Sequence, residues 1–334
     1  MQQRYLEVWE PKGAVRIRNL EDFMRQIRKI TKPRARPVPE KNRFLFRGTS
    51  DSAWDLLPSL PRSVGSGLKK PKTKLDRPWL TPELLYHIEK ESFQQFKMKA
   101  RLYIAPEFLP KDDSVVGWWQ LMQHHGAKTR LLDWTSSPFL AAYFAVAENA
   151  TKDGAIWAVE HGAHSDRMGE RHSEQFKKHG NEIRRELQLC QFLPSTKHSR
   201  QLVDSLVFLP CGTPNQRMSA QRGWFSVTSM IDTDHGEAIA RAFDDPKHQH
   251  RWWCQRFIIE RKAKSEILRD LWDMNITGET IFCGLDGLGR AMSELTDLLA
   301  PSVYCDFRLE EGLLSAERRS RRNGRNPARS RQTT

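Results

Sequence analysis

Apolar residues in this sequence follow two patterns, the three-to-four-residue spacing of helices and the short runs of buried strands. The two kinds of segment do not alternate regularly, which favours an α+β fold over a doubly wound sheet. Helices are expected from Leu20 to Ile30, from Thr81 to about Tyr103, around 118–122, over 139–147, from Glu266 to Met274, and in a final segment ending near Leu299.

Short apolar runs bounded by turn residues predict the strands. These runs are Tyr5–Trp9, 43–48, 131–132, Gly154–Val159, Leu202–Leu209, 215–227 and Trp252–Ile259. The connecting segments are richer in glycine, proline and charged residues, which is typical of loops and turns. Irregular or loop structure is expected at 31–41, 54–62 and 63–77, and turns at 210–214 and 281–287.

Composition divides the chain into three parts. Residues 1–39 are expected to form an N-terminal strand and helix extension, and residues 40–300 the main domain. Within that domain the interval 161–200 is polar and is interpreted as a helical insertion. Residues 301–334 form a C-terminal segment whose arginine-rich end, from Arg318 onward, has the composition of a disordered basic tail. The tail is either functional or simply solvated.

The formal net charge of +13 at pH 7 indicates a polyanionic partner, and nucleic acid is the one expected. No apolar run reaches the length of a membrane span, and the N-terminus lacks a signal-peptide core, so we expect a cytoplasmic protein without a membrane partner. The cysteines form no CxxC pair, and the histidines of the 161–200 interval lack the spacing of a tetrahedral site. No metal is therefore expected.

The densest mixture of polar chemistry runs from Gln123 to Pro138, directly before the apolar segment 139–147. Thr135 or Ser136 is a candidate cap for the helix that follows, with Pro138 near its first turn. Such a corner exposes backbone N–H groups and side-chain hydroxyls together, which suits an anionic or ribose-bearing ligand. The alternative interpretation is a capped core helix without a ligand.

Two further groups of residues leave alternatives open. Arg47 precedes Gly48 at the end of a short apolar strand, where a guanidinium can hold a phosphate or pyrophosphate in bidentate fashion; the alternative is an ordinary surface arginine. Asp133 can orient His124 for proton transfer. Asp133 can instead form a local ion pair with Arg130, three residues before it, and this second arrangement is favoured.

The tripeptide Phe46–Gly48 and the block Gln123–Thr135 resemble the FRG domain family, which is named for its Phe-Arg-Gly motif. Further blocks of resemblance are Glu89–Ala100, Asn215–Phe225 and Leu285–Gly287, so the likeness extends over roughly 40–295. FRG domains in turn look like distant relatives of the ADP-ribosyltransferases, which split NAD and pass ADP-ribose to an acceptor. The resemblance thus implies an ADP-ribosyltransferase-like mixed sheet core with flanking helices.

The resemblance also assigns roles to individual residues. Arg47 matches the arginine that holds the NAD phosphates, and the hydroxyls that begin at Thr135 match the motif that braces the nicotinamide pocket. Gln221, in a later strand, falls where the catalytic glutamate is expected; it can make the hydrogen bond to the ribose without supplying the charge. The implied catalytic residues are Arg47, Thr135 and Gln221, and the implied NAD-binding residues are Arg47, Gly48, Thr49, His124, Arg130, Asp133, Thr135, Ser136 and Tyr143.

The leading expectation is an NAD-dependent ADP-ribosyltransferase that modifies nucleic acid, RNA in preference to DNA, as a bacterial toxin or anti-phage defence effector. NAD is its co-substrate, and an antitoxin or inhibitory protein is a further possible partner. The alternatives are a catalytically silent FRG module that binds nucleotide or nucleic acid, and a transferase that modifies proteins. If Gln221 is not at the catalytic position, Glu260 or Glu279 is the next candidate carboxylate.

Overall fold

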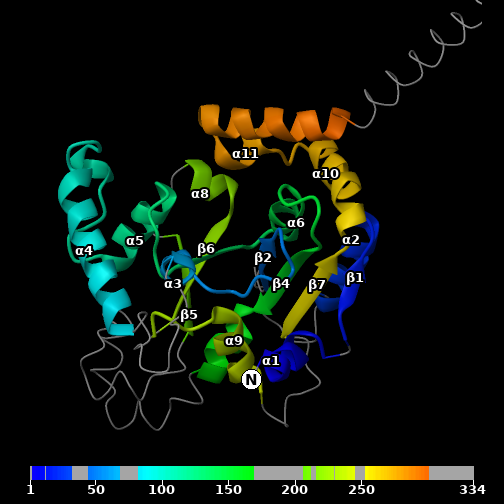
Figure 1. The fold of residues 1–334 in the computed structure, drawn as a ribbon, viewed down its shortest axis with the longest axis horizontal. Coiled ribbons are helices and arrows are strands. Elements are labelled where there is room, and N and C mark those ends of the chain that lie inside the picture. The colour runs from blue at the N-terminus through cyan, green and yellow to red at the C-terminus, as the bar shows by residue number, and fades with distance from the viewer. Residues whose placement is uncertain are drawn as a thin grey trace, which may run out of the picture. The chain divides into compact units, whose positions relative to one another are not determined.

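The structure is a computed structural model that describes residues 2–11, 13–31, 44–67, 82–168, 206–211, 216–228, 230–244 and 253–300. The chain divides into two compact units, 1–276 and 277–334. The first unit contains a β-sheet with helices on both of its faces (Figure 1). Most of the polar interval 161–200, the expected loops at 32–41 and 68–77, and the basic tail lie outside the described residues.

The strands and helices of the first unit carry the residues of the candidate site and hold them in position. Its strands are β1 Val15–Ile17, β2 Phe44–Thr49, β3 Leu132–Thr135, β4 Gly154–Glu160, β5 Leu206–Pro210, β6 Gly223–Thr228 and β7 Cys254–Ile259. Its helices are α1 Gln2–Trp9, α2 Leu20–Thr31, α3 Ser59–Gly67, α4 Pro82–Ala100, α5 Val115–His124, α6 Pro138–Val146, α8 Gln216–Ala220, α9 His235–Phe243 and α10 Lys264–Asp273, with short 3-10 turns at Pro106–Phe108 and Arg261–Ala263 and a helical segment at 161–168.

The strands form one seven-stranded sheet in the order β1-β7-β4-β2-β3-β6-β5 (Figure 1). β1 pairs with β7 in parallel, and the other neighbouring strands pair antiparallel. The mixed sheet and the uneven order of helices and strands confirm the expected α+β fold. Because β1 comes from the N-terminal 1–39 segment, that segment contributes a strand to the same sheet as the main domain.

α6 lies directly on one face of the sheet, against β2 and β4. A Cβ atom on Gly48 would lie 1.9 Å from the carbonyl oxygen of Ala141, and one on Gly154 would lie 2.4 Å from that of Ala145. Any side chain at these two positions would push the helix away from the strands. The close approach explains why the apolar segment 139–147 is rich in alanine, since small side chains let the helix and sheet backbones meet.

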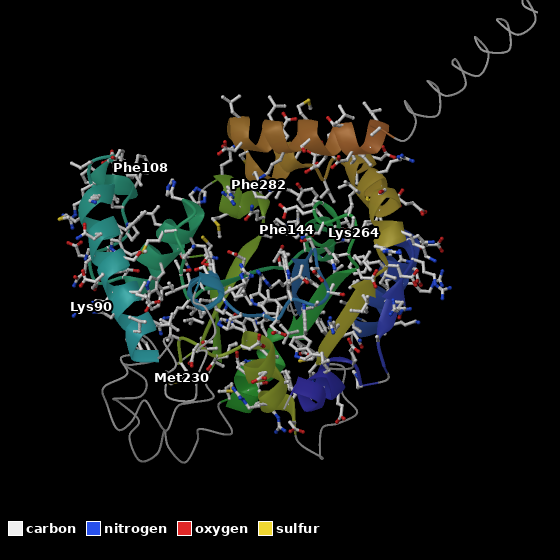
Figure 2. All side chains as sticks on the ribbon, in the orientation of Figure 1. Lys90, Phe108, Phe144, Met230, Lys264 and Phe282 are labelled. Atoms are coloured by element: carbon white, nitrogen blue, oxygen red, sulfur yellow. The ribbon has the colours of Figure 1, made fainter. Side chains whose placement is uncertain are left out.

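Lys264, at the start of α10, holds the C-terminal end of α6 in place (Figure 2). Its buried Nζ donates hydrogen bonds to the carbonyl oxygens of Ser50 at 2.7 Å, Glu148 at 3.0 Å and Asn149 at 3.0 Å. Burial lowers the pKa of Lys264, while two of its three carbonyl partners, Glu148 and Asn149, follow the C-terminal end of α6, where a cation is favoured. One side chain therefore joins α10, the end of α6 and the segment after β2.

The opposite face of the sheet carries α1 and α9, which contact β7 and β6 respectively. The rings of Trp9 and Trp157 pack edge to face with centroids 4.9 Å apart, and Trp9 Nε1 donates to the carbonyl oxygen of Gly236 at 2.9 Å. Leu45 and Trp134 belong to the same apolar cluster. Since side chains alternate along a strand, this face takes the odd-numbered residues of β2, while α6 covers the even-numbered ones.

A buried chain of hydrogen bonds fixes α9 to the sheet. Trp134 Nε1 donates to Ser226 Oγ at 2.7 Å, and Ser226 Oγ lies 2.7 Å from His235 Nδ1. On the other side of the ring, Thr228 Oγ1 lies 3.4 Å from His235 Nε2 and donates its own proton to the carbonyl oxygen of Met230 at 2.8 Å. The donors run in one direction when Nε2 carries the imidazole proton, so the network requires a neutral His235.

Most of the expected elements are present. The helices α2, α4, α5, α6 and α10 and the strands β2, β3, β4, β5 and β7 confirm the predictions made from apolar spacing, with boundaries shifted by a few residues. The expected strand at 202–209 is described only from Leu206, and the expected turn at 210–214 lies mostly outside the described residues.

The strand predicted at Tyr5–Trp9 was wrong, and the strand predicted at 215–227 is present only in its second part, as β6. Tyr5–Trp9 belongs to α1, where Leu6 and Trp9, three residues apart, share the helix face that packs into the core. The segment 215–227 contains α8 before β6, and the chain reverses at Arg222, whose φ of 47° is left-handed. Gln221 is therefore in a turn and not in a strand, which corrects the placement expected for it.

Three further expectations need correction. The irregular segment and loop expected over 54–77 contain α3 up to Gly67, and α9 was not anticipated at all. The turn expected at 281–287 is reduced to Cys283, because α11, Gly278–Phe282, occupies its start and the helical segment 284–300 its end. α9 was missed because its N-terminal turn is polar; Asp234 caps it by accepting from the Glu237 N–H at 2.9 Å.

The second unit contains α11 and a helical segment at 284–300. A capping box formed by Thr277 and Thr280 begins α11. Within the unit, Glu294 Oε2 accepts from the Gly278 N–H at 3.1 Å, and the Arg290 guanidinium lies 4.2 Å from the Phe282 ring centroid. Among the helices that the structure describes, none combines the length and apolar character needed to cross a membrane.

Candidate functional site

The polar residues singled out in the sequence meet where β2 and β3 lie side by side. β2 pairs with β4 along its whole length, whereas its described pairing with β3 consists of Phe46 opposite Thr135. Next to that pair, Arg47 Nη1 donates to the carbonyl oxygen of Asp133 at 2.7 Å. We call this place the β2–β3 seam and define it by Arg47, Phe46, Asp133 and Thr135. The arginine side chain therefore bridges the seam.

Arg47 is a largely buried cation whose guanidinium has an unpaired hydrogen-bond donor. Its side chain is 18% exposed, and its Nε atom is buried without a hydrogen-bond partner. Burial lowers the pKa of Arg47 to about 10, an effect that Asp133 opposes and Arg62 reinforces. The guanidinium still carries its charge at neutral pH. A buried donor without a partner is uncommon in native structures. Because this donor belongs to a charged guanidinium, an anionic ligand is the kind of partner that would satisfy it.

Asp133 is held in position from the protein side while its carboxylate faces solvent. The side chain is 61% exposed, and its Oδ2 lies 4.0 Å from Arg47 Nη1. Gln123 Nε2 donates to Asp133 Oδ1 at 2.7 Å, and Gln123 Oε1 accepts in turn from the hydroxyl of Thr129. The Thr129 hydroxyl also accepts from the Leu131 N–H at 3.2 Å. A relay of side chains from one sequence block thus orients this carboxylate.

Thr135 attaches the turn that carries Gln221 to the seam. Its hydroxyl donates to the carbonyl oxygen of Gln221 at 2.8 Å and accepts from the Ser137 N–H at 3.1 Å. The Ser136 N–H donates to the carbonyl oxygen of Arg222 at 3.2 Å. The structure therefore brings Thr135 and Gln221 together, as the resemblance implied, although the threonine hydroxyl is buried and already engaged on both sides.

The cap of α6 differs from the one expected. Ser137, and neither Thr135 nor Ser136, is the N-cap residue; its side chain accepts from the Leu140 N–H at 3.4 Å, and Pro138 occupies the first turn. Thr135 is displaced from the cap because it is the last residue of β3 and pairs with β2.

Three of the expected NAD-binding residues lie in the packing around the seam. α6 covers Gly48, while Thr49 and Tyr143 are buried. Directly paired residues of neighbouring strands share a face, so Thr135 lies on the α6 face with Phe46, and Arg47 projects toward the other face. The guanidinium reaches the seam from the side opposite to the Thr135 hydroxyl.

Arg130 does not pair with Asp133, which corrects the expected local ion pair. Its Nε donates to Glu89 Oε1 at 2.8 Å, its Nη2 contacts Glu89 Oε2, and its guanidinium lies 4.9 Å from the ring centroids of both Tyr86 and Trp119. Burial opposes the charge of Arg130, but the Glu89 carboxylate outweighs it and raises the pKa of the arginine. A charge this deeply buried needs a counter-charge, and Glu89 of α4 supplies it.

His124 also has surroundings different from those of the expected dyad. Asp133 accepts from Gln123, whereas His124 Nδ1 is buried without a hydrogen-bond partner. Burial lowers the pKa of His124, and the neighbouring His125 and Arg217 lower it further. The ring lines an apolar cavity of about 230 Å³ with His125, Leu121, Phe108, Met218, Cys211, Ile104, Pro110, Gly117 and Gln120.

Two residues that support the seam were not assigned a role from the sequence. Gln123 belonged to the central block but had no assigned function. Its side chain meets Asp133, ten residues later, only because the fold brings the C-terminal end of α5 to β3. Glu89 belonged to a block of resemblance, and the signal for its role is a carboxylate that falls on the buried side of an amphipathic helix. Among the described residues, no group of three or more histidines, cysteines, aspartates and glutamates is arranged to hold a metal ion.

The fold and the seam define an α+β protein whose clustered polar residues lie where two adjacent strands share little pairing. Residues 42–154 match the sequence model of the FRG domain, so the chain contains an FRG domain over that range. The match includes Arg47, Gln123 and Asp133 and ends before Gln221. Comparisons with curated proteins and with solved structures gave no match.

Proposed function

We propose that this protein is an NAD-dependent ADP-ribosyltransferase whose reaction takes place at the β2–β3 seam. The observation that carries the proposal is the largely buried guanidinium of Arg47, with an unpaired Nε and an exposed carboxylate beside it. A pyrophosphate is the anion that such a planar donor set binds in bidentate fashion. The likeness of the Arg47 and Thr135 segments to ADP-ribosyltransferase motifs supports the same assignment.

The proposed reaction needs the protein to hold NAD and stabilise charge. The bond between the nicotinamide nitrogen and ribose C1′ breaks, and its electron pair leaves with nicotinamide. C1′ then bonds to a nucleophilic atom of the acceptor, which loses a proton to solvent. Arg47 holds the phosphates, while the Gln221 turn, attached through Thr135, lies at the far side of the seam.

Nucleic acid is the proposed acceptor, with RNA favoured over DNA. The formal net charge of +13 and the arginine-rich sequence after Arg318 attract a polyanion. The attraction between basic side chains and phosphates supplies most of the free energy of nonspecific nucleic-acid binding. ADP-ribosylation of RNA that the cell needs would damage that cell, so the proposal includes a role as toxin or defence effector and a restraining partner protein.

A second candidate function is a catalytically silent FRG module that binds nucleotide or nucleic acid. The observation in its favour is Gln221, a neutral residue at the position where the resemblance calls for a glutamate. Modification of proteins is a third candidate function, because a basic surface also attracts acidic proteins.

The test is to incubate the full chain with NAD labelled in the adenylate part and, separately, with RNA, DNA and a cell lysate. The proposal expects nicotinamide release together with transfer of label to RNA. Label on lysate protein would favour the protein-modifying alternative, and NAD binding without nicotinamide release would favour the silent module. The absence of NAD binding, turnover and transfer would contradict the proposal.

The matched surface control for Arg47→Ala is Arg18→Ala. The Arg18 side chain is 76% exposed and follows β1, a strand that β7 and β4 separate from β2. The control therefore removes the same charge at a distance from the seam.

A further inference from the structure

We propose that Asp133 is the catalytic carboxylate of the seam, supplying the negative charge that Gln221 lacks; this inference rests on the proposed function. The carboxylate accepts a hydrogen bond from the 2′-hydroxyl of the nicotinamide ribose and faces the positive charge that develops at C1′. Gln123 is a positioning residue that acts through Asp133.

Asp133 stands beside the proposed phosphate clamp. Its Oδ2 lies 4.0 Å from Arg47 Nη1. The same arginine atom is tied to the Asp133 carbonyl at 2.7 Å, which fixes the backbone of the aspartate relative to the clamp. A ligand whose phosphates engage the free side of Arg47 therefore has Asp133 next to it.

The carboxylate of Asp133 is exposed and yet firmly supported. The side chain is 61% exposed, and an exposed ion pair contributes little to stability. Even so, one carboxylate oxygen is held by Gln123, and Gln123 is held by the buried Thr129. Such an arrangement fixes Oδ1 through a hydrogen bond, while Oδ2 makes the longer ion pair with Arg47 Nη1 at 4.0 Å. Ordered support behind a solvent-facing group is what a reacting carboxylate requires.

Asp133 also supplies a charge that the neighbouring turn does not. Gln221 lies in the turn that Thr135 tethers, and its amide is neutral, so it can donate or accept hydrogen bonds but cannot balance a cation. A carboxylate can do so, and electrostatic stabilisation of this kind is commonly the largest single contribution to catalysis. Asp133 and Thr135, which holds the Gln221 turn, are two residues apart on β3, so the carboxylate and the turn belong to neighbouring positions of one strand.

The reaction balances without any additional reagent. The C1′–N bond breaks with its electron pair going to nicotinamide, whose ring nitrogen becomes neutral. The acceptor atom bonds to C1′ and releases a proton to solvent, or water does so and free ADP-ribose results. Asp133 keeps its charge throughout, because it stabilises the transition state and is not consumed.

The experiment measures NAD affinity and the rate of nicotinamide release by the full chain, with Asp133→Asn, Gln123→Leu and Gln221→Ala as variants. Asp133→Asn keeps the shape and removes the charge, so we expect the rate to fall by about 10²-fold or more. NAD affinity should stay equal or become tighter, because Arg47 loses a competing carboxylate. Gln221→Ala, which removes one neutral hydrogen bond, should cost about tenfold in rate. Gln123→Leu should lower the rate with little change in NAD affinity.

Each outcome decides the matter. An Asp133→Asn variant that melts normally and keeps the parental rate overturns the assignment while the proposed function stands. Loss of NAD affinity equal to the loss of rate also overturns it, because Asp133 would then bind and not catalyse. A parental chain that neither binds nor splits NAD overturns both proposals. Asp133→Glu, which retains the charge, guards against a folding defect and should keep more activity than Asp133→Asn.

Discussion

The carboxylate of Glu89 and the guanidinium of Arg130 form a buried, two-pronged ion pair between α4 and the residue that leads into β3. Both side chains are nearly inaccessible, at 8% and 2% exposed, and the rings of Tyr86 and Trp119 flank the arginine. The pair fixes Arg130 to α4, and Arg130 belongs to the segment from Thr129 to Asp133. It thereby positions the seam without contacting it.

Breaking this pair on one side should be costly. Glu89→Ala leaves Arg130 buried without its counter-charge, so we expect the free energy of unfolding to fall by about 3–5 kcal/mol. Replacing both partners with apolar residues, as in Glu89→Leu with Arg130→Met, should recover much of that loss. Denaturant unfolding of the three variants measures the effect. A Glu89→Ala chain within about 1 kcal/mol of the parent would mean that the pair does not anchor α4.

His235 should make the fold sensitive to acid. Burial lowers its pKa to about 3, whereas the unfolded chain has a histidine pKa of about 6.5. The unfolded state therefore binds more protons between these values, so stability is complete above about pH 6.5 and is lost as the pH falls toward 3, by about 5 kcal/mol in total. Asp234, whose pKa burial raises to about 6, acts in the opposite direction.

The measurement is the pH dependence of unfolding free energy for the parent and for His235→Gln. The variant cannot titrate at this position, so its stability should fall less steeply below pH 6.5, and the Asp234 contribution cancels in the comparison. Curves that run parallel from pH 7 to pH 4 would show that His235 is not a buried neutral group.

Gly48→Ala should destabilise the protein through the contact of β2 with α6. The added methyl group would lie 1.9 Å from the carbonyl oxygen of Ala141, and backbone must move to admit it. We expect a loss of about 1–3 kcal/mol or more, the usual range for overpacking. Gly289→Ala is the control, because a methyl group there meets nothing within 4 Å and should be neutral or stabilising. Thermal midpoints of the two variants that coincide would contradict the account of Gly48.

The sequence after Arg318 should contribute to nucleic-acid affinity and not to stability. It contains almost no apolar residue that could offset the entropy of ordering, so its removal should leave the thermal midpoint unchanged. RNA affinity should fall and its salt dependence should flatten, by roughly one unit of log–log slope for each phosphate that the shortened chain no longer neutralises. Filter binding over a salt series checks this, and an unchanged slope would assign RNA binding elsewhere.

Local patterns predicted the elements better than they predicted the partners within the site. The segments at α2 and α4 were predicted because apolar residues repeat at helical spacing over several turns, and α6 because a continuous apolar run follows a helix-start signal. α8 spans five residues and has one buried anchor, Met218, so no period could distinguish it from a strand. Arg130 was assigned to Asp133, three residues away, because sequence alone gives proximity along the chain and not the position of α4.

The candidate site shows the same limit. The resemblance to known motifs was enough to name the candidate residues. Which of them lie at the seam and which are buried in the packing around it depends on the face of β2 to which each side chain points. Gly48 lies against α6 and Arg47 at the seam, although the two are adjacent in sequence, because consecutive side chains point to opposite sides of a strand.

The central claim is that Arg47 holds the phosphates of NAD, and the direct measurement is the NAD dissociation constant of the parent, Arg47→Ala, Arg47→Lys and the surface control Arg18→Ala. Each lost charge-assisted hydrogen bond is worth about 1.5–3 kcal/mol, so Arg47→Ala should weaken binding by about ten-fold to 150-fold per bond. Arg47→Lys, which keeps the charge but not the planar donor set, should bind with intermediate affinity. Arg18→Ala should match the parent. An Arg47→Ala chain that melts normally and binds NAD as tightly as the parent would contradict the claim.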